Sequence, residues 1–176
     1  NIGKSPLFPK YETFADFLSN TIIGKRKHTI SEFFYRTQHI QQLGGYQIYP
    51  AGYYADDASI LLFCNNNGIA STEESLIVYR KSENNISSSS CWNVEKSKAA
   101  LKYYQWIIDE FPMKQQDEQI IQQRLDFDLY TYFSAALNIH QSIQILNCIP
   151  VNIWNWKKKL LCLYKFILNS YAKQIK

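Results

Sequence analysis

The sequence predicts an α+β protein that is mostly helical, with a first part containing short strands and a helical C-terminal region. Two observations support this prediction. Short aromatic and β-branched runs, typical of strands, alternate with helical patterns in the first half of the chain. From Val94 onward apolar residues recur at helical spacing, and only short polar links separate the segments. We therefore expect one part over residues 1–110 and a helical region over residues 111–176.

The predicted elements follow from these patterns and from turn residues at their ends. Gly24 ends the first helix, the run Asn65-Asn66-Asn67-Gly68 ends the third, and Pro112 ends the fourth. Helices are predicted at 11–23, 36–43, 56–66, 94–111, 115–136, 141–146 and 154–175. Strands are predicted at 30–35, 46–49 and 75–81. A polar loop of Asn and Ser residues is expected at 83–90.

Composition excludes several classes of protein. The net charge of +4 is small and comes mostly from the last twenty residues, which argues against nucleic acid as a partner. The four cysteines are far apart and show no Cys-x-x-Cys spacing, so we expect reduced thiols, no zinc site and a cytoplasmic setting. No run of about 18 apolar residues is present to span a membrane.

An acidic pair, Asp56 and Asp57, starts an otherwise apolar helical run just after a glycine turn and a short aromatic segment. One interpretation is helix capping, because acidic side chains accept hydrogen bonds from the first-turn amides and favour the positive end of the helix dipole. The other is that one carboxylate caps the helix while its neighbour faces a cleft as a general base.

Several segments around this pair resemble, in order and spacing, the second half of a family-2 glycosyltransferase of the GT-A type. The resemblance covers about residues 5–110, and no single segment is specific by itself. The segments are Thr29-Ile30-Ser31-Glu32-Phe33-Phe34-Tyr35-Arg36, Leu43-Gly44-Gly45-Tyr46, Tyr54-Ala55-Asp56-Asp57-Ala58, Gly68-Ile69, Leu76-Ile77-Val78-Tyr79-Arg80-Lys81-Ser82 and Asn85-Ile86-Ser87. This resemblance implies that residues 1–110 are the acceptor-side half of a catalytic domain.

The resemblance also implies roles for individual residues. Asp57 matches the base that deprotonates the acceptor hydroxyl, and Asp56 as the helix N-cap would orient the turn. Gly44 and Gly45 would allow the backbone to approach the sugar, although a plain helix C-cap explains them equally well. Glu32 falls among the residues that bind or support the acceptor.

Two further residues match the diphosphate side of the family's site. Arg80 and Ser82 occur where the family often has a basic residue near the leaving diphosphate, although a surface ion pair would also explain Arg80. The basic loop 25–28 has two interpretations, a contact with that diphosphate and an ordinary solvated charge run.

The chain also departs from the family pattern. No Asp-x-Asp metal motif precedes Thr29, and the Asp126-Phe127-Asp128 run matches it by letters only, inside a helical pattern. We therefore expect this chain to be the C-terminal part of a longer enzyme, inactive alone. The nucleotide-sugar donor and its divalent metal, Mn or Mg, would be bound by the missing N-terminal half, and this part would bind no cofactor or metal itself.

The remaining partners follow from the C-terminal region. The segment 153–176 is a basic amphipathic helix that places Leu160, Leu161, Tyr164, Leu168 and Tyr171 on one face. It would either contact the inner membrane peripherally, as suits a saccharide or lipid-linked acceptor, or pack against its own domain or a second subunit. The predicted function is sugar transfer in surface-polysaccharide synthesis. The competing class is a non-catalytic helical domain that binds another protein.

Overall fold

The computed structural model describes residues 8–26, 28, 30–64, 67–72 and 89–174. The described chain is mostly helical, as predicted, and contains one small two-stranded sheet. Its seven α-helices are α1 (Phe14–Ile22), α2 (Thr37–Gln42), α3 (Ala55–Cys64), α4 (Asn93–Glu110), α5 (Gln115–Ser134), α6 (Ile139–Cys148) and α7 (Trp156–Gln174). Each overlaps one of the seven predicted helices, so these predictions are confirmed.

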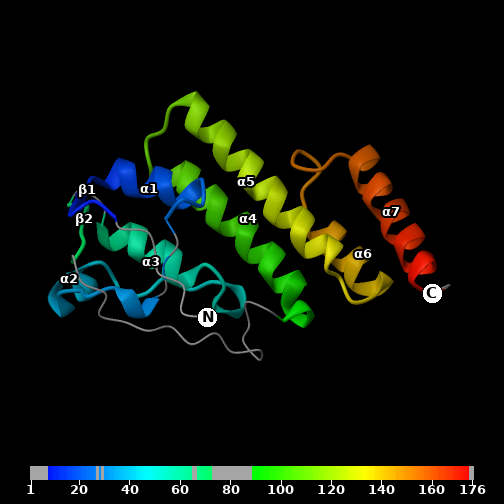
Figure 1. Ribbon diagram of the computed structural model, residues 1–176, viewed down its shortest axis with the longest axis horizontal. Coiled ribbons are helices and arrows are strands. Elements are labelled where there is room, and N and C mark those ends of the chain that lie inside the picture. The colour runs from blue at the N-terminus through cyan, green and yellow to red at the C-terminus, as the bar shows by residue number, and fades with distance from the viewer. Residues whose placement is uncertain (1–7, 27, 29, 65–66, 73–88, 175–176) are drawn as a thin grey trace.

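Two long helices, α4 and α5, pack side by side and form the middle of the molecule (Figure 1). In Figure 1, α1, α2 and α3 lie on one side of this pair, and α6 and α7 lie at its other end. Buried side chains of every helix except α2, together with others between the helices, form a core cluster, which includes Phe17, Ile60, Ile107, Leu129 and Trp154. Helices on both sides of residue 110 contribute to that cluster, and the division of the chain at this residue stays a prediction.

Local residues explain where the helices begin. Thr13 precedes α1, and its hydroxyl accepts a hydrogen bond from the amide of Asp16 at 3.2 Å. Asn138 precedes α6 and accepts one from the amide of Gln141 at 2.9 Å. In both cases a short polar side chain satisfies a first-turn amide that has no partner within the helix.

Two predicted strands are wrong. Ile30–Glu32 forms a 3₁₀ turn, and neither the rest of 30–35 nor the segment 46–49 is a strand. Their aromatic side chains pack against other rings instead: Phe33 stacks on Tyr35 with centroids 6.0 Å apart, and Tyr49 meets Tyr103 of α4 edge-on. Aromatic and β-branched residues favour any half-buried surface, so this composition did not distinguish a strand from an irregular segment lying on helices. The predicted strand 75–81 lies outside the described residues.

The sheet that does form was not predicted. It pairs two-residue strands, β1 (Tyr11–Glu12) and β2 (Ile69–Ala70), in antiparallel register with Glu12 opposite Ile69. Glu12 is buried and forms an ion pair with Arg26 at 2.9 Å, so this corner of the fold also holds the loop that follows α1. Strands this short give no periodic signal in a sequence.

Gly68, just before β2, provides a test of this corner. Its φ is +67°, and a Cβ atom there would lie 2.2 Å from the carbonyl oxygen of Glu12. Gly68→Ala is expected to lower the free energy of unfolding by about 3 kcal/mol or more. The added Cβ would force the two strands apart, and the alanine backbone would also be strained in the left-handed region.

Gly52 is the matched control for this substitution. It has a similar φ of +69°, but a Cβ there would meet nothing within 4 Å. Gly52→Ala should therefore cost only the backbone strain, about 1 kcal/mol. Urea unfolding of both variants measures the difference, and equal losses would contradict the close approach of β1 to Gly68.

Candidate functional site

A cleft of about 1030 Å³ opens between the N-terminal helices and the α4–α5 pair. Its walls are the loop after α1, the segment 51–54 that leads into α3, and the facing sides of α4 and α5. The polar and aromatic residues that line it include Arg26, His28, Tyr53, Tyr54, Asp56, Asp57, Tyr103, Tyr104, Arg124, Phe127, Asp128 and Tyr132. The acidic pair predicted from the sequence therefore lies in the wall of a large cleft.

The segment leading into α3 has an unusual backbone. Ala51 and Tyr54 have φ values of 52° and 65°, in the left-handed region that residues other than glycine rarely adopt. Such a conformation persists only where the surrounding contacts hold it. Here Tyr54 is held by its ring, which stacks on Tyr103 with centroids 4.7 Å apart, and by its hydroxyl.

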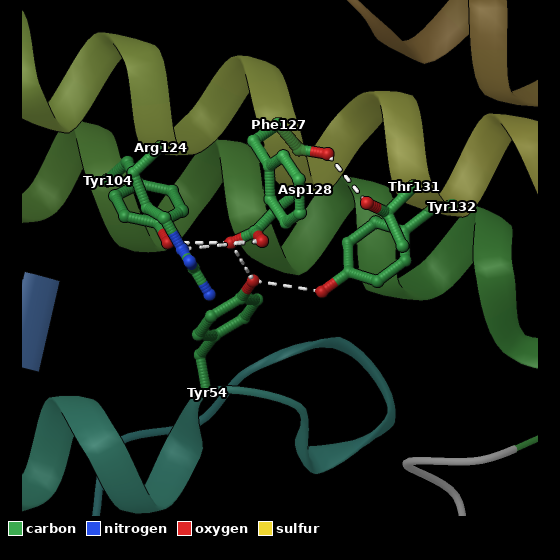
Figure 2. Close-up of polar contacts among 7 residues, drawn as sticks. All are labelled: Tyr54, Tyr104, Arg124, Phe127, Asp128, Thr131 and Tyr132. Atoms are coloured by element: carbon green, nitrogen blue, oxygen red, sulfur yellow. Dashed lines mark hydrogen bonds and ion pairs between the residues drawn. The ribbon is translucent and has the colours of Figure 1, made fainter. Parts of the chain in front are cut away.

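The hydroxyl of Tyr54 belongs to a hydrogen-bond network centred on Asp128 of α5 (Figure 2). Oδ2 of Asp128 accepts hydrogen bonds from Tyr54 at 2.9 Å and from Tyr104 of α4 at 2.6 Å. The hydroxyl oxygens of Tyr54 and Tyr132 are 2.9 Å apart; since Tyr54 donates to Asp128, Tyr132 is the donor to Tyr54. Arg124 approaches Oδ1 of Asp128 with its Nε at 3.5 Å.

Burial controls the protonation of these tyrosines. Loss of hydration raises the pKa values of Tyr54, Tyr103, Tyr104 and Tyr132, because the phenolate form is disfavoured away from water. The charge on Asp128 acts in the same direction on Tyr54, Tyr104 and Tyr132. The network therefore remains a set of neutral donors around one carboxylate and fixes the cleft wall that α4 and α5 form.

The acidic pair lies in the first turn of α3, but Asp56 is not the N-cap. The helix begins at Ala55, so Asp56 is already its second residue, and the assignment of Asp56 as the cap is wrong. Its Oδ1 still accepts the amide N–H of Asp57 at 3.1 Å. Burial, then the neighbouring charge of Asp57, raises the pKa of Asp56. The left-handed turn at Tyr54 starts the helix one residue earlier than the sequence indicated.

Asp57 is held by His28, which the sequence analysis treated only as part of the basic loop 25–28. His28 Nε2 and Asp57 Oδ1 are 2.9 Å apart, and the His28 side chain is only 4% exposed whereas that of Asp57 is 32% exposed. The imidazole contacts the rings of Phe17 and Phe33, with centroid distances of 5.7 and 5.2 Å. Asp57 thus combines one anchored oxygen with access to the cleft.

The surroundings of the imidazole indicate its tautomer. Among the described residues, the buried Nδ1 of His28 has no hydrogen-bond partner. A proton on Nδ1 would be a buried donor without an acceptor, which is costly. The arrangement therefore favours the proton on Nε2, from which it is donated to Asp57.

The interpretation of the loop 25–28 as a solvated charge run is wrong for two of its residues. Lys25 is exposed, but Arg26 is buried, pairs with Glu12 and lies over the ring of Phe17 at 5.4 Å. His28 is buried against Asp57. Which side chains of a short irregular loop are buried depends on tertiary contacts that a charge pattern does not reveal.

Three further residues of the predicted site do not line this cleft: Gly44, Gly45 and Glu32. Gly44 and Gly45 follow α2 with φ values of +82° and +85°, and their amides bond to carbonyls of that helix, as expected of a C-cap. Glu32 is exposed in the 3₁₀ turn. Arg80 and Ser82 lie outside the described residues.

Sequence reasoning missed Tyr54, Tyr104, Arg124 and Asp128 as parts of the cleft. One signal was present: Arg124 and Asp128 are four residues apart on a helix, a spacing that brings the two side chains together. The tyrosines carried no comparable signal, because aromatic residues at helical spacing indicate a core as readily as a site.

Comparison with known proteins adds no relationship: no protein-family model, curated protein or solved structure matches the chain. In the described ranges, no three His, Cys, Asp or Glu side chains are grouped so that they could hold a metal ion. The four cysteines, all in the described part, form no disulfide, and burial raises the pKa of Cys64 to about 12. Over the same residues, no helix is both long and apolar enough to cross a membrane.

Proposed function

We propose that this chain is the acceptor-side part of a GT-A glycosyltransferase that transfers sugar from a nucleotide-sugar to a saccharide or lipid-linked acceptor in surface-polysaccharide synthesis. The observation that carries the proposal is the position of Asp57. Its carboxylate lies at the start of α3 in the wall of a cleft of about 1030 Å³, with one oxygen anchored by His28. This is the residue that the family resemblance assigns as the base.

The proposed chemistry requires a carboxylate that can take one proton from an acceptor hydroxyl. With Oδ1 of Asp57 engaged by His28, Oδ2 is the oxygen left to accept that proton. The acceptor oxygen then forms a bond to the anomeric carbon of the donor, and the bond to the leaving diphosphate breaks. A buried imidazole donor keeps the carboxylate in one orientation without competing for the acceptor's proton.

The lining of the cleft is suited in composition to a sugar. Phe127 is 59% exposed and Tyr53 half-buried, so the lining offers aromatic rings on which the apolar face of a pyranose could stack. Neighbouring polar groups of Arg124 and Asp57 could hydrogen-bond to hydroxyls.

The donor side of the reaction is proposed to belong to another part of the enzyme. The described residues of this chain offer no set of side chains that fits Mn or Mg. Proton removal by Asp57 needs no metal ligand from this chain. We propose a cytoplasmic setting, where nucleotide-sugars are available.

The competing proposal, a non-catalytic helical domain that binds another protein, is favoured by a different observation. The described part of α7 exposes several large apolar side chains, among them Trp156 and Leu160. The two proposals differ in what the cleft binds. Saccharide binding next to Asp57 is expected of the glycosyltransferase and is not expected of an interaction domain.

Ligand titrations test the proposed function. Saccharides at millimolar concentration are expected to shift the amide NMR signals of cleft-lining residues, whereas nucleotide-sugars with manganese should show no low-micromolar affinity by calorimetry. Phe127→Ala should weaken saccharide binding about fivefold through lost stacking. Tyr130→Ala is the matched control, because Tyr130 is an exposed aromatic residue of the same helix outside the cleft lining.

Either of two results would contradict the proposal. Low-micromolar binding of a nucleotide-sugar would overturn the assignment to the acceptor side alone. Absence of any saccharide effect on the cleft signals would favour the interaction domain.

A further inference from the structure

The outer face of α7 is an exposed apolar surface that the proposed function does not use. Trp156, Leu160 and Tyr164 follow one another at four-residue spacing and are 66%, 64% and 60% exposed. Ile167 and Leu168 continue the same side of the helix and are also exposed. At 3.6 residues per turn these positions form one stripe along the helix.

This stripe is exposed although the opposite side of α7 is firmly packed. Cys162 is buried in the core, and the ammonium group of the buried Lys159 donates to the carbonyl of Leu146 at 2.7 Å and to that of Ile149. Lys158 forms an ion pair with Asp126 of α5. The helix therefore has a fixed inner face, and rotation about its axis cannot bury the stripe.

The charges on α7 indicate which kind of partner its outer face would bind. The last acidic residue of the sequence is Asp128, and lysines 157, 158, 159, 165 and 173 all lie in α7. Of these, Lys157 lies within the apolar stripe at its N-terminal end and Lys165 lies beside it, and both are exposed. A surface that combines apolar side chains with lysines and lacks acids is complementary to anionic lipid headgroups.

We propose that the outer face of α7 binds the surface of an anionic phospholipid membrane, with the helix axis parallel to the bilayer. Trp156, Leu160 and Tyr164 would enter the boundary between headgroups and acyl chains. Lys157 would extend its ammonium group toward the lipid phosphates. The lysines that interrupt the apolar sequence suit a helix that lies on a membrane rather than one that spans it.

A second copy of the chain is a less suitable occupant of the same face. Two identical faces in contact would bring the Lys157 and Lys165 side chains of both copies together with no acid in α7 to compensate. Like charges in a desolvated interface oppose association. An anionic bilayer meets the same lysines with the opposite charge.

Co-sedimentation of the whole chain with phospholipid vesicles tests this proposal. Binding is expected to vesicles of phosphatidylcholine with roughly 30% phosphatidylserine, and to be at least tenfold weaker to phosphatidylcholine alone. Leu160→Gln should weaken binding about tenfold by removing an apolar contact. Lys157→Glu should weaken it about fivefold or more, with a reduced dependence on salt.

Matched substitutions elsewhere separate these effects from general changes in the protein. Ile48 is 84% exposed in the segment before 51–54, and Lys25 is exposed after α1. Ile48→Gln and Lys25→Glu should leave vesicle binding unchanged, and circular dichroism should show that all four variants are folded. These experiments need no enzyme activity, so they succeed or fail independently of the proposed function.

Three outcomes would overturn the proposal. The first is equal binding to neutral and anionic vesicles. The second is equal weakening by the α7 variants and their controls. The third is self-association through α7, detected as dimers by light scattering that Leu160→Gln abolishes, without any vesicle binding.

Discussion

Replacing Asp57 by asparagine is expected to lower sugar transfer about 10²- to 10⁴-fold, because the amide cannot accept the proton of the acceptor hydroxyl. The substitution keeps size and shape, and the Asn carbonyl can still accept a hydrogen bond from His28. The free energy of unfolding should therefore change by no more than about 1 kcal/mol. The measurement is the transfer rate of the enzyme that carries this chain together with its donor-binding part, paired with its melting temperature.

Asp56→Asn is the matched control, since Asp56 lies in the same helical turn. Burial raises the pKa of Asp56, which means that its charged form is destabilised in the folded protein. Neutralising it should leave stability unchanged or raise it, and the loss of transfer should be much smaller than for Asp57→Asn. Near wild-type transfer by a folded Asp57→Asn enzyme would show that the acidic pair only starts a helix.

The positions of the helices could be predicted because their signals are local. Thr13 and Asn138 begin helices, and Pro112 marks the end of α4, by interactions with residues within a turn or two. The aromatic segments around residues 33 and 48 were assigned wrongly for the converse reason. Whether such a segment pairs with a strand or packs on a helix depends on partners far away in the sequence.

The candidate site also combines a local feature that the sequence shows with contacts between distant residues that it does not show. The pair Asp56 and Asp57 stands out in the sequence because two acids begin an apolar helix. The contact between His28 and Asp57 joins residues 29 positions apart, and that between Tyr54 and Asp128 joins residues 74 positions apart. Neither has a periodic or motif signal, so only the folded chain brings these groups together. The one local exception, the four-residue spacing of Arg124 and Asp128, gives no indication that the pair faces a cleft.

The buried tyrosines around Asp128 lead to a second large expected effect, which is a loss of stability in alkali. In the unfolded chain a tyrosine loses its proton near pH 10, whereas burial raises the pKa values of Tyr54, Tyr103, Tyr104 and Tyr132 in the folded protein. Above about pH 10 the unfolded state therefore binds fewer protons than the folded state, and the free energy of unfolding falls as pH rises. The contribution of these protonated tyrosines to stability is complete below about pH 10. It is lost as the pH rises toward their raised pKa values in the folded protein.

The size of this effect follows from the number of groups. Each contributes a slope of about 1.4 kcal/mol per pH unit, so the four tyrosines together give about 5.5 kcal/mol per unit. Burial lowers the pKa of Lys96 from its usual 10.5, so this group opposes the fall in stability only up to about pH 10.5. A typical domain has a stability of about 5–15 kcal/mol, so a slope of this size above pH 10 should unfold the chain between about pH 11 and about pH 13.

Urea unfolding at a series of pH values, with the absorbance of tyrosinate followed in parallel, measures this slope, and two variants assign it. Tyr104→Phe should lower stability at neutral pH by about 1–2 kcal/mol, because Asp128 loses a donor, and should flatten the alkaline slope by about 1.4 kcal/mol per unit. Tyr164→Phe is the control, since Tyr164 is 60% exposed on α7 and should change neither quantity. If the folded chain instead titrates all its tyrosines near pH 10 without losing stability, water reaches the hydroxyls, and the α4–α5 wall is not the closed network around Asp128 on which the geometry of the cleft depends.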